Sequence, residues 1–351
     1  DVLTKKAGSN KAFLWKSDGK TGFTMKESKR ESQGTTITLY LNDEGKEFAS
    51  RWSLESTVKK YSDHISFPIF LEYEETIPAK EKDDEEVKEI KVEQINSASA
   101  FWMQSKGQLK KKDYNEFYKS FSNDSEDPLM HMHTQAEGTI NYTTLFYIPK
   151  KAPFDLYYPE HKTAIKLYIN RVFVTDDDKE LMPTYLRFVK GVIDSEDLPL
   201  NVSREILQQN RVLSKIKSNS VKKIIDEIIK LSKNSEKYNE FYSQFGKPIK
   251  EGLYQDYDNR DKLIELIRFN TTKSDEMISF AEYVLNMKKD QKNIYFITGT
   301  DKNTLKNSPL LEMYNKKDIE VCIFDDEIDD IVFSGVFKYK EYDLKSVTYS
   351  D

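Results

Sequence analysis

The residues most suited to chemistry in this sequence lie at the start of one predicted helix, which carries a single arginine. Asn201 or Ser203 can cap the helix by accepting hydrogen bonds from its first backbone N–H groups, and Arg204 follows at once. The helix dipole favours anions at this end, so a cation there is unusual. A guanidinium beside free backbone N–H groups predicts a site for a phosphate group.

The residues before this helix predict a buried strand and a turn that position it. Residues 188–193 are apolar apart from Lys190 and Gly191, which is typical of a strand inside a sheet. An acidic turn follows, and Pro199 keeps the next segment extended, because the residue before a proline is pushed out of the helical region. In an alternative interpretation Arg204 binds no phosphate and pairs with the acids of this turn, Asp194, Glu196 and Asp197.

The composition excludes several classes of function. The chain has 351 residues and a net charge of −6, so it lacks the basic balance of a nucleic-acid-binding protein. No apolar run approaches the length of a membrane helix, and we expect no membrane partner. The one cysteine, Cys322, excludes an internal disulfide and is expected to be buried in a strand. The chain starts at Asp1 without a methionine, and we interpret it as a fragment of a longer protein.

The first 91 residues predict a strand-rich segment and a linker. Residues 1–75 contain a hairpin around residues 17–20, a strand from Gly34 to Leu41 and a helix that begins at Ser53. Residues 76–91 are dominated by charge and contain Pro78, which is typical of a solvated linker.

Residues 92–202 predict a large α/β layer. Aromatic residues at helical spacing predict a helix over residues 112–121, with core packing as the simplest role for its rings. His131 and His133 alternate with methionines, but no third ligand is nearby, so we predict a loop or strand edge and no metal site. Phe154 opens an aromatic loop, which either meets a partner or packs on its own core.

The remainder predicts a helical connector and a smaller α/β unit. Residues 203–250 have a wide apolar stripe, interpreted as two helices joined near residues 218–220 and a third that stops at Gly246. Residues 251–351 predict two strands joined by a helix over residues 303–316. The acidic run 325–330 is interpreted as a helix cap or a solvated face.

The motif DLPLNVSREILQQN, together with YLRFVKGVIDSE, residues 151–183 and residues 283–299, resembles the heat-shock protein 90 family of ATP-dependent chaperones. The resemblance covers nearly the whole chain and is greatest to the bacterial type. It implies an α/β (α+β) fold: the end of a GHKL-type nucleotide-domain sheet, then a middle domain of two α/β layers joined by helices. The motifs that bind most of the nucleotide in this family are expected before residue 1.

The resemblance also implies roles for particular residues. Arg204 would contact the γ-phosphate of ATP, and Gln208 would help to place the catalytic loop, with Asn201 and Glu205 supporting it. Gly34 and Thr35 would line the adenine end of the pocket. The family's middle domain can meet client proteins, which suggests as contacts Phe154, Leu156 and Tyr157.

For the whole protein, the resemblance implies ATP with Mg²⁺ as cofactors and partly folded client proteins as partners. Co-chaperones, a homodimer formed through a further domain and a cytoplasmic location are also expected. For this fragment alone, no bound cofactor and no ATP turnover are expected. The alternative is a docking module for clients or co-chaperones that has no chemistry of its own.

Overall fold

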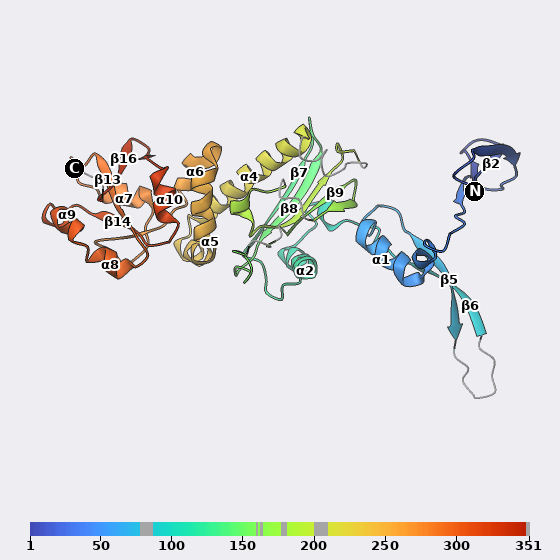
Figure 1. Ribbon diagram of the computed structural model, residues 1–351, viewed down its shortest axis with the longest axis horizontal. Helices are drawn as coiled ribbons and strands as arrows, with labels where there is room; N and C mark the ends of the chain where they lie inside the picture. Colours follow the sequence, from blue (N-terminus) through green and yellow to red (C-terminus); the bar gives the residue numbers. More distant parts are fainter. Residues whose placement is uncertain (78–86, 159–160, 162–163, 177–180, 200–209, 349–351) are drawn as a thin grey trace. The chain divides into compact units, whose positions relative to one another are not determined.

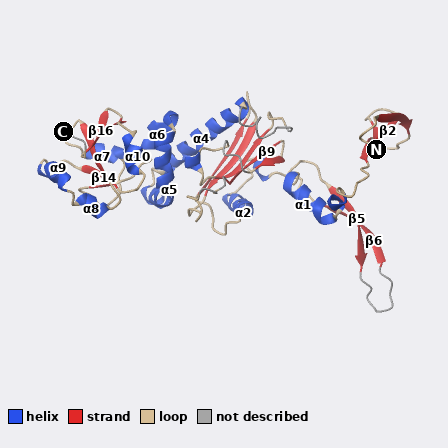
Figure 2. Cartoon of the chain, viewed as in Figure 1, coloured by secondary structure: helices blue, strands red, loops and turns tan. Residues whose placement is uncertain are grey.

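The computed structural model describes the chain except residues 78–86, 159–160, 162–163, 177–180, 200–209 and 349–351. Its described residues divide into a first unit, residues 1–59 and 70–95, and a second unit, residues 60–69 and 96–351 (Figure 1). Both units contain helices and strands (Figure 2). The predicted mixed α/β class is therefore confirmed, while the finer domain boundaries stay predictions.

The first unit contains a four-stranded antiparallel sheet in the order β3-β2-β1-β4. Its strands are β1 (Val2–Lys5), β2 (Ala12–Ser17), β3 (Phe23–Ser28) and β4 (Gly34–Ile37). The predicted hairpin joins β2 to β3, and the Asp18 carboxylate fixes its turn by accepting the Lys20 and Thr21 backbone N–H groups at 2.9 Å each. β4 ends at Ile37, before the predicted end at Leu41.

A short 3₁₀ helix, η1 (Lys46–Ala49), precedes helix α1 (Arg51–Tyr61). α1 begins before the predicted start at Ser53. The reason is that Ser50 supplies the hydroxyl at this end, and its Oγ accepts the Ser53 backbone N–H at 3.2 Å.

Strands β5 (Phe70–Ile77) and β6 (Val87–Gln94) pair antiparallel as a separate two-stranded sheet. The prediction of a linker over residues 76–91 is therefore wrong for residues 76–77 and 87–91, which belong to β5 and β6. Lys88 forms an ion pair with Glu74 across the two strands, and Lys91 does so with Glu75. The charges that suggested a solvated linker thus serve as cross-strand pairs.

The second unit begins with a five-stranded sheet in the order β10-β9-β11-β8-β7. β11 is parallel to β9 and antiparallel to β8. The edge strand β7 carries His131 and His133, as one of the two sequence-based alternatives expected. The strands are β7 (Met130–Ala136), β8 (Tyr142–Ile148), β9 (Ala164–Ile169), β10 (Val172–Thr175) and β11 (Lys190–Ser195).

Alternate residues of this sheet belong to two different cores, because successive side chains of a strand point to opposite faces. Leu145 and Tyr147 of β8 pack with η2 (Phe101–Met103) and α2 (Lys111–Ser122). Phe146 and Ile148 pack in a larger core that includes residues of the long helices α4 (Arg211–Leu231) and α5 (Ser235–Gln255). The sheet is therefore covered on both faces. A short 3₁₀ helix, η3 (Thr184–Leu186), precedes β11.

The two long helices differ from their prediction. α4 continues through residues 218–220, so the predicted break there is wrong; Ser220 is buried, and the apolar stripe on both sides of it makes packing outweigh a small loss of helix propensity. α5 continues past Gly246 and Pro248 to Gln255, so the predicted stop is also wrong. A Cβ at Gly246 would lie 3.0 Å from the Tyr242 ring, so this glycine allows close packing rather than ending the helix.

The chain ends in a second five-stranded sheet, in the order β12-β14-β13-β16-β15. β13 is parallel to β14 and to β16, which confirms the predicted strand pair, and Cys322 is fully buried on β14 as predicted. The strands are β12 (Asn270–Thr271), β13 (Asn293–Thr298), β14 (Val321–Phe324), β15 (Lys338–Tyr339) and β16 (Tyr342–Ser346).

Short helices connect these strands. The predicted helix over residues 303–316 is interrupted at Pro309, because proline has no backbone N–H to continue the ladder. Of the acidic run, Asp325, Glu327 and Asp330 are exposed as a solvated face requires, whereas Asp326 and Asp329 form ion pairs with Lys250. The helices are η4 (Tyr257–Asn259), α6 (Arg260–Ile264), α7 (Phe280–Asn286), α8 (Lys302–Lys306), η5 (Pro309–Leu311), α9 (Glu312–Lys316) and α10 (Asp329–Ser334).

Candidate functional site

Strand β11 directly precedes the segment that contains Arg204, which the sequence analysis selected as the candidate site. It lies between β9 and β8 in the middle of the large sheet, and its last residues, Asp194 and Ser195, are buried. Gly191 allows this close packing, because a Cβ there would lie 2.1 Å from the Leu145 carbonyl oxygen. The strand is therefore a fixed base for the residues that follow.

Asp194 connects the end of β11 to two other parts of the second unit. One carboxylate oxygen accepts the indole N–H of Trp102 at 2.8 Å, and the other accepts the backbone N–H of Arg171 at 3.2 Å. Burial raises the pKa of Asp194, while these two donors and the Arg171 guanidinium favour its charged form. The carboxylate thus has neutral hydrogen-bond donors around it and one cation nearby.

The residues after Asp194 are also held to their surroundings. The backbone N–H of Glu196 donates to the Asn141 carbonyl at 3.2 Å, and the Asn141 backbone N–H donates to the Asp197 carboxylate at 2.5 Å. Leu198 packs in the larger core. These contacts fix the chain as far as Leu198, shortly before residues 200–209, which lie outside the described part.

The far end of that gap is fixed by a helix cap. The Asn210 side chain accepts the backbone N–H groups of Val212 at 2.8 Å and Leu213 at 3.2 Å, and so caps α4. The four predicted site residues of this segment lie outside the described residues: Asn201, Arg204, Glu205 and Gln208.

The three acids with which Arg204 could alternatively pair have contacts of their own. Asp194 binds Trp102 and Arg171, and Asp197 accepts the Asn141 N–H. Glu196 lies 4.0 Å from the guanidinium of Arg171. All three carboxylates therefore have partners within the described part of the chain.

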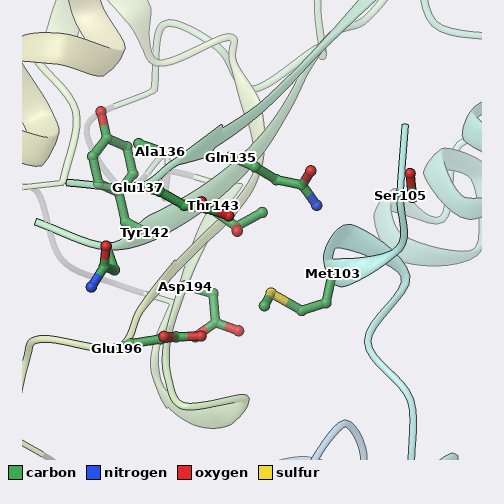
Figure 3. Close-up of a pocket in the computed structure, with 10 residues that line it drawn as sticks. Met103, Ser105, Gln135, Ala136, Glu137, Tyr142, Thr143, Asp194 and Glu196 are labelled. Carbon is green, nitrogen blue, oxygen red and sulfur yellow. The ribbon is translucent and has the colours of Figure 1, made fainter. Parts of the chain in front are cut away.

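A cavity of about 550 Å³ opens beside the end of β11 (Figure 3). Three carboxylates line it, Glu137, Asp194 and Glu196, together with the thioether of Met103. The figure shows Met103 and Glu196 on either side of Asp194. Among the described residues that line it there is no lysine, arginine or histidine, so these residues do not suit a phosphate group.

Gly34 and Thr35 lie on β4 and pair with Lys5 and Thr4 of β1. The Thr35 hydroxyl lies 2.8 Å from the Thr4 hydroxyl, and both side chains are exposed. The structure thus brings Thr35 to an accessible sheet surface, where its hydroxyl can accept or donate one further hydrogen bond.

The aromatic loop after Pro153 has one buried and two exposed members. Leu156 is 1% exposed and belongs to the large core, so it is wrong as a surface contact for clients. Phe154 is 88% exposed and Tyr157 54% exposed. The Arg187 guanidinium lies 5.3 Å from the centre of the Tyr157 ring, and it also forms an ion pair with Glu251, which anchors this loop to α5.

The histidines of β7 serve packing and hydrogen bonding. His133 contacts the Tyr114 hydroxyl through Nδ1 at 2.9 Å and the Trp102 carbonyl through Nε2 at 2.7 Å. His131 stacks on the Tyr114 ring. Within the described ranges no group of three histidine, cysteine or acidic side chains is placed to hold a metal ion. Nor does any described helix combine the length and apolarity that crossing a membrane requires.

The sequence did not predict the contact between Trp102 and Asp194, which lie 92 residues apart. The one local signal was an acidic residue directly after an apolar strand, where a buried carboxylate needs a partner. That signal indicates that a partner exists without indicating which residue supplies it.

Comparison with known proteins identifies the family. A model of the Hsp90 protein family matches residues 72–351. The chaperone protein HtpG of Helicobacter pylori (strain ATCC 700392 / 26695) is 54% identical over 351 residues, which cover 100% of this chain and 56% of that protein. HtpG of Treponema denticola is 53% identical over 365 residues, covering 99% of this chain and 56% of the relative. HtpG of Borreliella burgdorferi is 50% identical over 352 residues, covering 100% and 57%.

The chain therefore spans little more than half the length of the curated relatives it matches. The relatives are bacterial, which confirms the type to which the sequence is most similar. The chain belongs to the Hsp90 protein family.

Proposed function

We propose that this chain is part of an Hsp90-type chaperone that binds partly folded proteins and hydrolyses ATP. The relatives at 50–54% identity carry the name chaperone protein, which supports the first part. In this proposal the whole protein works in the cytoplasm as a homodimer, with co-chaperones as further partners. The second part rests on Arg204.

The observation that carries the ATPase proposal is the way both ends of the segment 200–209 are held. Asp197 and Leu198 fix its entry, and the Asn210 cap fixes its exit. A group that stabilises charge in a transition state must be held in place before the reaction, because reorganisation at that moment would cost rate. The contacts of Leu198 and Asn210 supply such fixed points on the two sides of the segment that carries Arg204.

The donor set of the segment fits a phosphoryl group. A planar guanidinium presents two parallel N–H donors to phosphate oxygens, so Arg204 can neutralise charge on the γ-phosphate. Gln208 lies four residues on, a helical spacing from which its amide can help place the loop, and Asn201 and Glu205 support it. ATP, when bound, supplies the phosphoryl group that water attacks. No described group of residues fits Mg²⁺, so no step here is assigned to the metal.

Replacing Arg204 in the full-length protein tests this proposal. Arg204→Ala should lower ATP turnover by about 10- to 100-fold, less than the largest effects of such arginines, because domain closure also limits turnover. ATP affinity and the melting temperature should stay close to those of the parent protein. Arg211→Ala is the matched control, since it removes an exposed arginine of α4 and should leave turnover unchanged.

The result that contradicts the proposal is a well-folded Arg204→Ala protein with full turnover. The alternative pairing of Arg204 with the acidic turn predicts the reverse pattern, a lower melting temperature with turnover per folded molecule intact. Measuring turnover, affinity and melting on one preparation separates the two interpretations.

A second candidate function, docking without chemistry, is favoured by the exposed rings of Phe154 and Tyr157. Exposed aromatic side chains on an anchored loop offer apolar area to a partly folded client. Phe154→Ser should weaken suppression of aggregation of a chemically denatured test protein while ATP turnover without client stays unchanged. Equal suppression by the parent protein and the variant would exclude this loop as a docking site.

A further inference from the structure

The buried carboxylate of Asp194 lies where three separate stretches of the second unit meet. It is the last residue but one of β11, it accepts the Trp102 indole N–H from η2, and it accepts the Arg171 backbone N–H from the turn between β9 and β10. Its side chain is 3% exposed. An ionisable group this deeply buried requires partners, and here both carboxylate oxygens have one.

The turn that supplies Arg171 is itself unusual. Asn170 and Arg171 have φ values of 49° and 67°, in the left-handed region that side chains with a Cβ seldom adopt. In this conformation the Arg171 N–H reaches Asp194, and the Asn170 N–H donates to the Ser195 carbonyl at 3.1 Å. Two consecutive backbone donors therefore hold two consecutive residues at the end of β11.

The same turn extends the network to a loop outside the sheet. The Arg171 guanidinium donates to the Ser66 hydroxyl and lies 4.0 Å from Glu196. Asn96 fixes the loop that contains Ser66, because its side chain accepts the Ile69 N–H at 2.8 Å and donates to the Phe67 carbonyl at 3.0 Å. The end of β11 is thus tied to residues 60–69 as well as to η2.

We propose that Asp194 is a positioning residue for ATP turnover: it holds the end of β11 in the place from which residues 196–199 lead to Arg204. This inference rests on the proposed function of Arg204. Asp194 touches no substrate in this proposal. It acts through Ser195, Glu196 and Asp197, whose contacts follow directly along the chain.

Asp194→Asn tests this with little change of shape. An amide has one oxygen, so either Trp102 or Arg171 must face an NH₂ group instead of an acceptor. The network then loosens, and turnover in the full-length protein should fall by about 10-fold or more, in line with the effect of small displacements on an oriented reaction. ATP affinity should not change, because the effect lies in placing Arg204 and not in holding the nucleotide.

Trp102→Phe is the second variant and keeps the proposal testable if Asp194→Asn folds poorly. It removes the indole N–H and retains an aromatic ring in the core. Tyr147→Phe is the matched control, since it removes a buried hydrogen bond of 3.0 Å to the Tyr114 carbonyl from the same core without touching β11's end. Turnover of Tyr147→Phe should equal that of the parent protein.

Combining each variant with Arg204→Ala decides the outcome. If Asp194 acts through Arg204, the double variant turns over ATP no more slowly than Arg204→Ala alone, because the two residues belong to one unit. Multiplied losses in the double variant, or a lower melting temperature with unchanged turnover per folded molecule, would overturn the positioning role. A normal rate for Arg204→Ala would overturn the proposed function and this inference together, whereas a slow Arg204→Ala beside a normal Asp194→Asn overturns this inference alone.

Discussion

The Lys250 ammonium on α5 lies 2.9 Å from a carboxylate oxygen of Asp329 on α10, and the two side chains are 3% and 0% exposed. Asp326 is a second partner, at 2.6 Å. Burial raises the pKa of Asp329 and opposes the charged form of Lys250, but Tyr242 and the two carboxylates still raise the pKa of Lys250. This cluster attaches the long helix α5 to α10, the helix that lies between strands β14 and β15.

Lys250→Met should lower the free energy of unfolding by about 3–5 kcal/mol, because it leaves the fully buried Asp329 carboxylate without its cation. Urea unfolding of the variant and the parent chain measures this. Lys262→Met is the matched control, since its ion pair with Asp226 has both side chains 45% exposed and should contribute about 0–1 kcal/mol. Equal losses in the two variants would show that the buried pair is not special.

Gly191→Ala should be among the most destabilising single changes in the large sheet. The residue has a φ of +152°, and a Cβ there would lie 2.1 Å from the Leu145 carbonyl oxygen in the neighbouring strand. The contacted atom belongs to the backbone of β8, which cannot move aside. We therefore expect the free energy of unfolding, measured in urea, to fall by about 3 kcal/mol. Gly107→Ala, whose Cβ would meet nothing within 4 Å, should stay within about 0.5 kcal/mol of the parent.

Acid should destabilise the second unit through the histidines of β7. Burial lowers the pKa of both His131 and His133, so the folded state binds fewer protons than the unfolded state once the pH falls below the ordinary histidine pKa of about 6.5. Their contribution to stability is therefore present at neutral pH and is lost as the pH falls from there toward the lowered values. Unfolding free energies measured between pH 7.5 and about pH 5.5 should show this slope.

His133→Gln should flatten that slope, because it removes one of the two titrating rings. The difference between variant and parent is the quantity to use, since it cancels the carboxylates that titrate nearby. Tyr114→Phe is the control: it removes the hydroxyl that contacts Nδ1 of His133 but keeps the histidine, so it should lower stability and retain the slope. A parent slope that persists in His133→Gln would contradict the assignment.

The parts of this fold that the sequence predicted are those in which a local pattern decides. The apolar run before Asp194 predicted the central strand β11, and the turn residues 17–20 predicted the hairpin of β2 and β3. The prediction of a linker over residues 87–91 failed for the opposite reason. Their charges are paired across a hairpin with residues that lie beyond the span of a local pattern, so composition alone indicated a linker.

The candidate site shows the same division. Arg204 and Gln208 were found through a motif, which is a local signal, and they lie outside the described residues. The contacts of Asp194 join residues far apart in the chain, so only the fold reveals them. Leu156 was assigned with its loop neighbours, although its side chain points into the core, because a short aromatic run does not show which member is buried.

This chain alone should bind ATP weakly or not at all. Thr35 lies exposed on β4, and the cavity beside Asp194 is lined by carboxylates that repel a triphosphate. Calorimetric titration with ATP measures this directly. A dissociation constant in the micromolar range would show that the nucleotide pocket is in this chain and has been misplaced.

Arg204→Lys in the full-length protein should recover part of the turnover that Arg204→Ala loses. An ammonium keeps the positive charge but cannot form two parallel hydrogen bonds to phosphate oxygens, so a rate between those of Arg204→Ala and the parent protein is expected. Gln208→Ala should lower turnover less than Arg204→Ala, because the glutamine carries no charge. Steady-state rates at saturating ATP give the order parent, Gln208→Ala, Arg204→Lys, Arg204→Ala.

That order separates the role of charge from the role of shape. If Arg204 only holds its loop through an ion pair, lysine retains the pair and Arg204→Lys turns over ATP at nearly the parent rate. If Arg204 binds the phosphoryl group, lysine falls well short even though the variant melts at the parent temperature. Thermal melting of all three variants is the control, and a full rate for Arg204→Lys would remove the two-pronged contact from the mechanism.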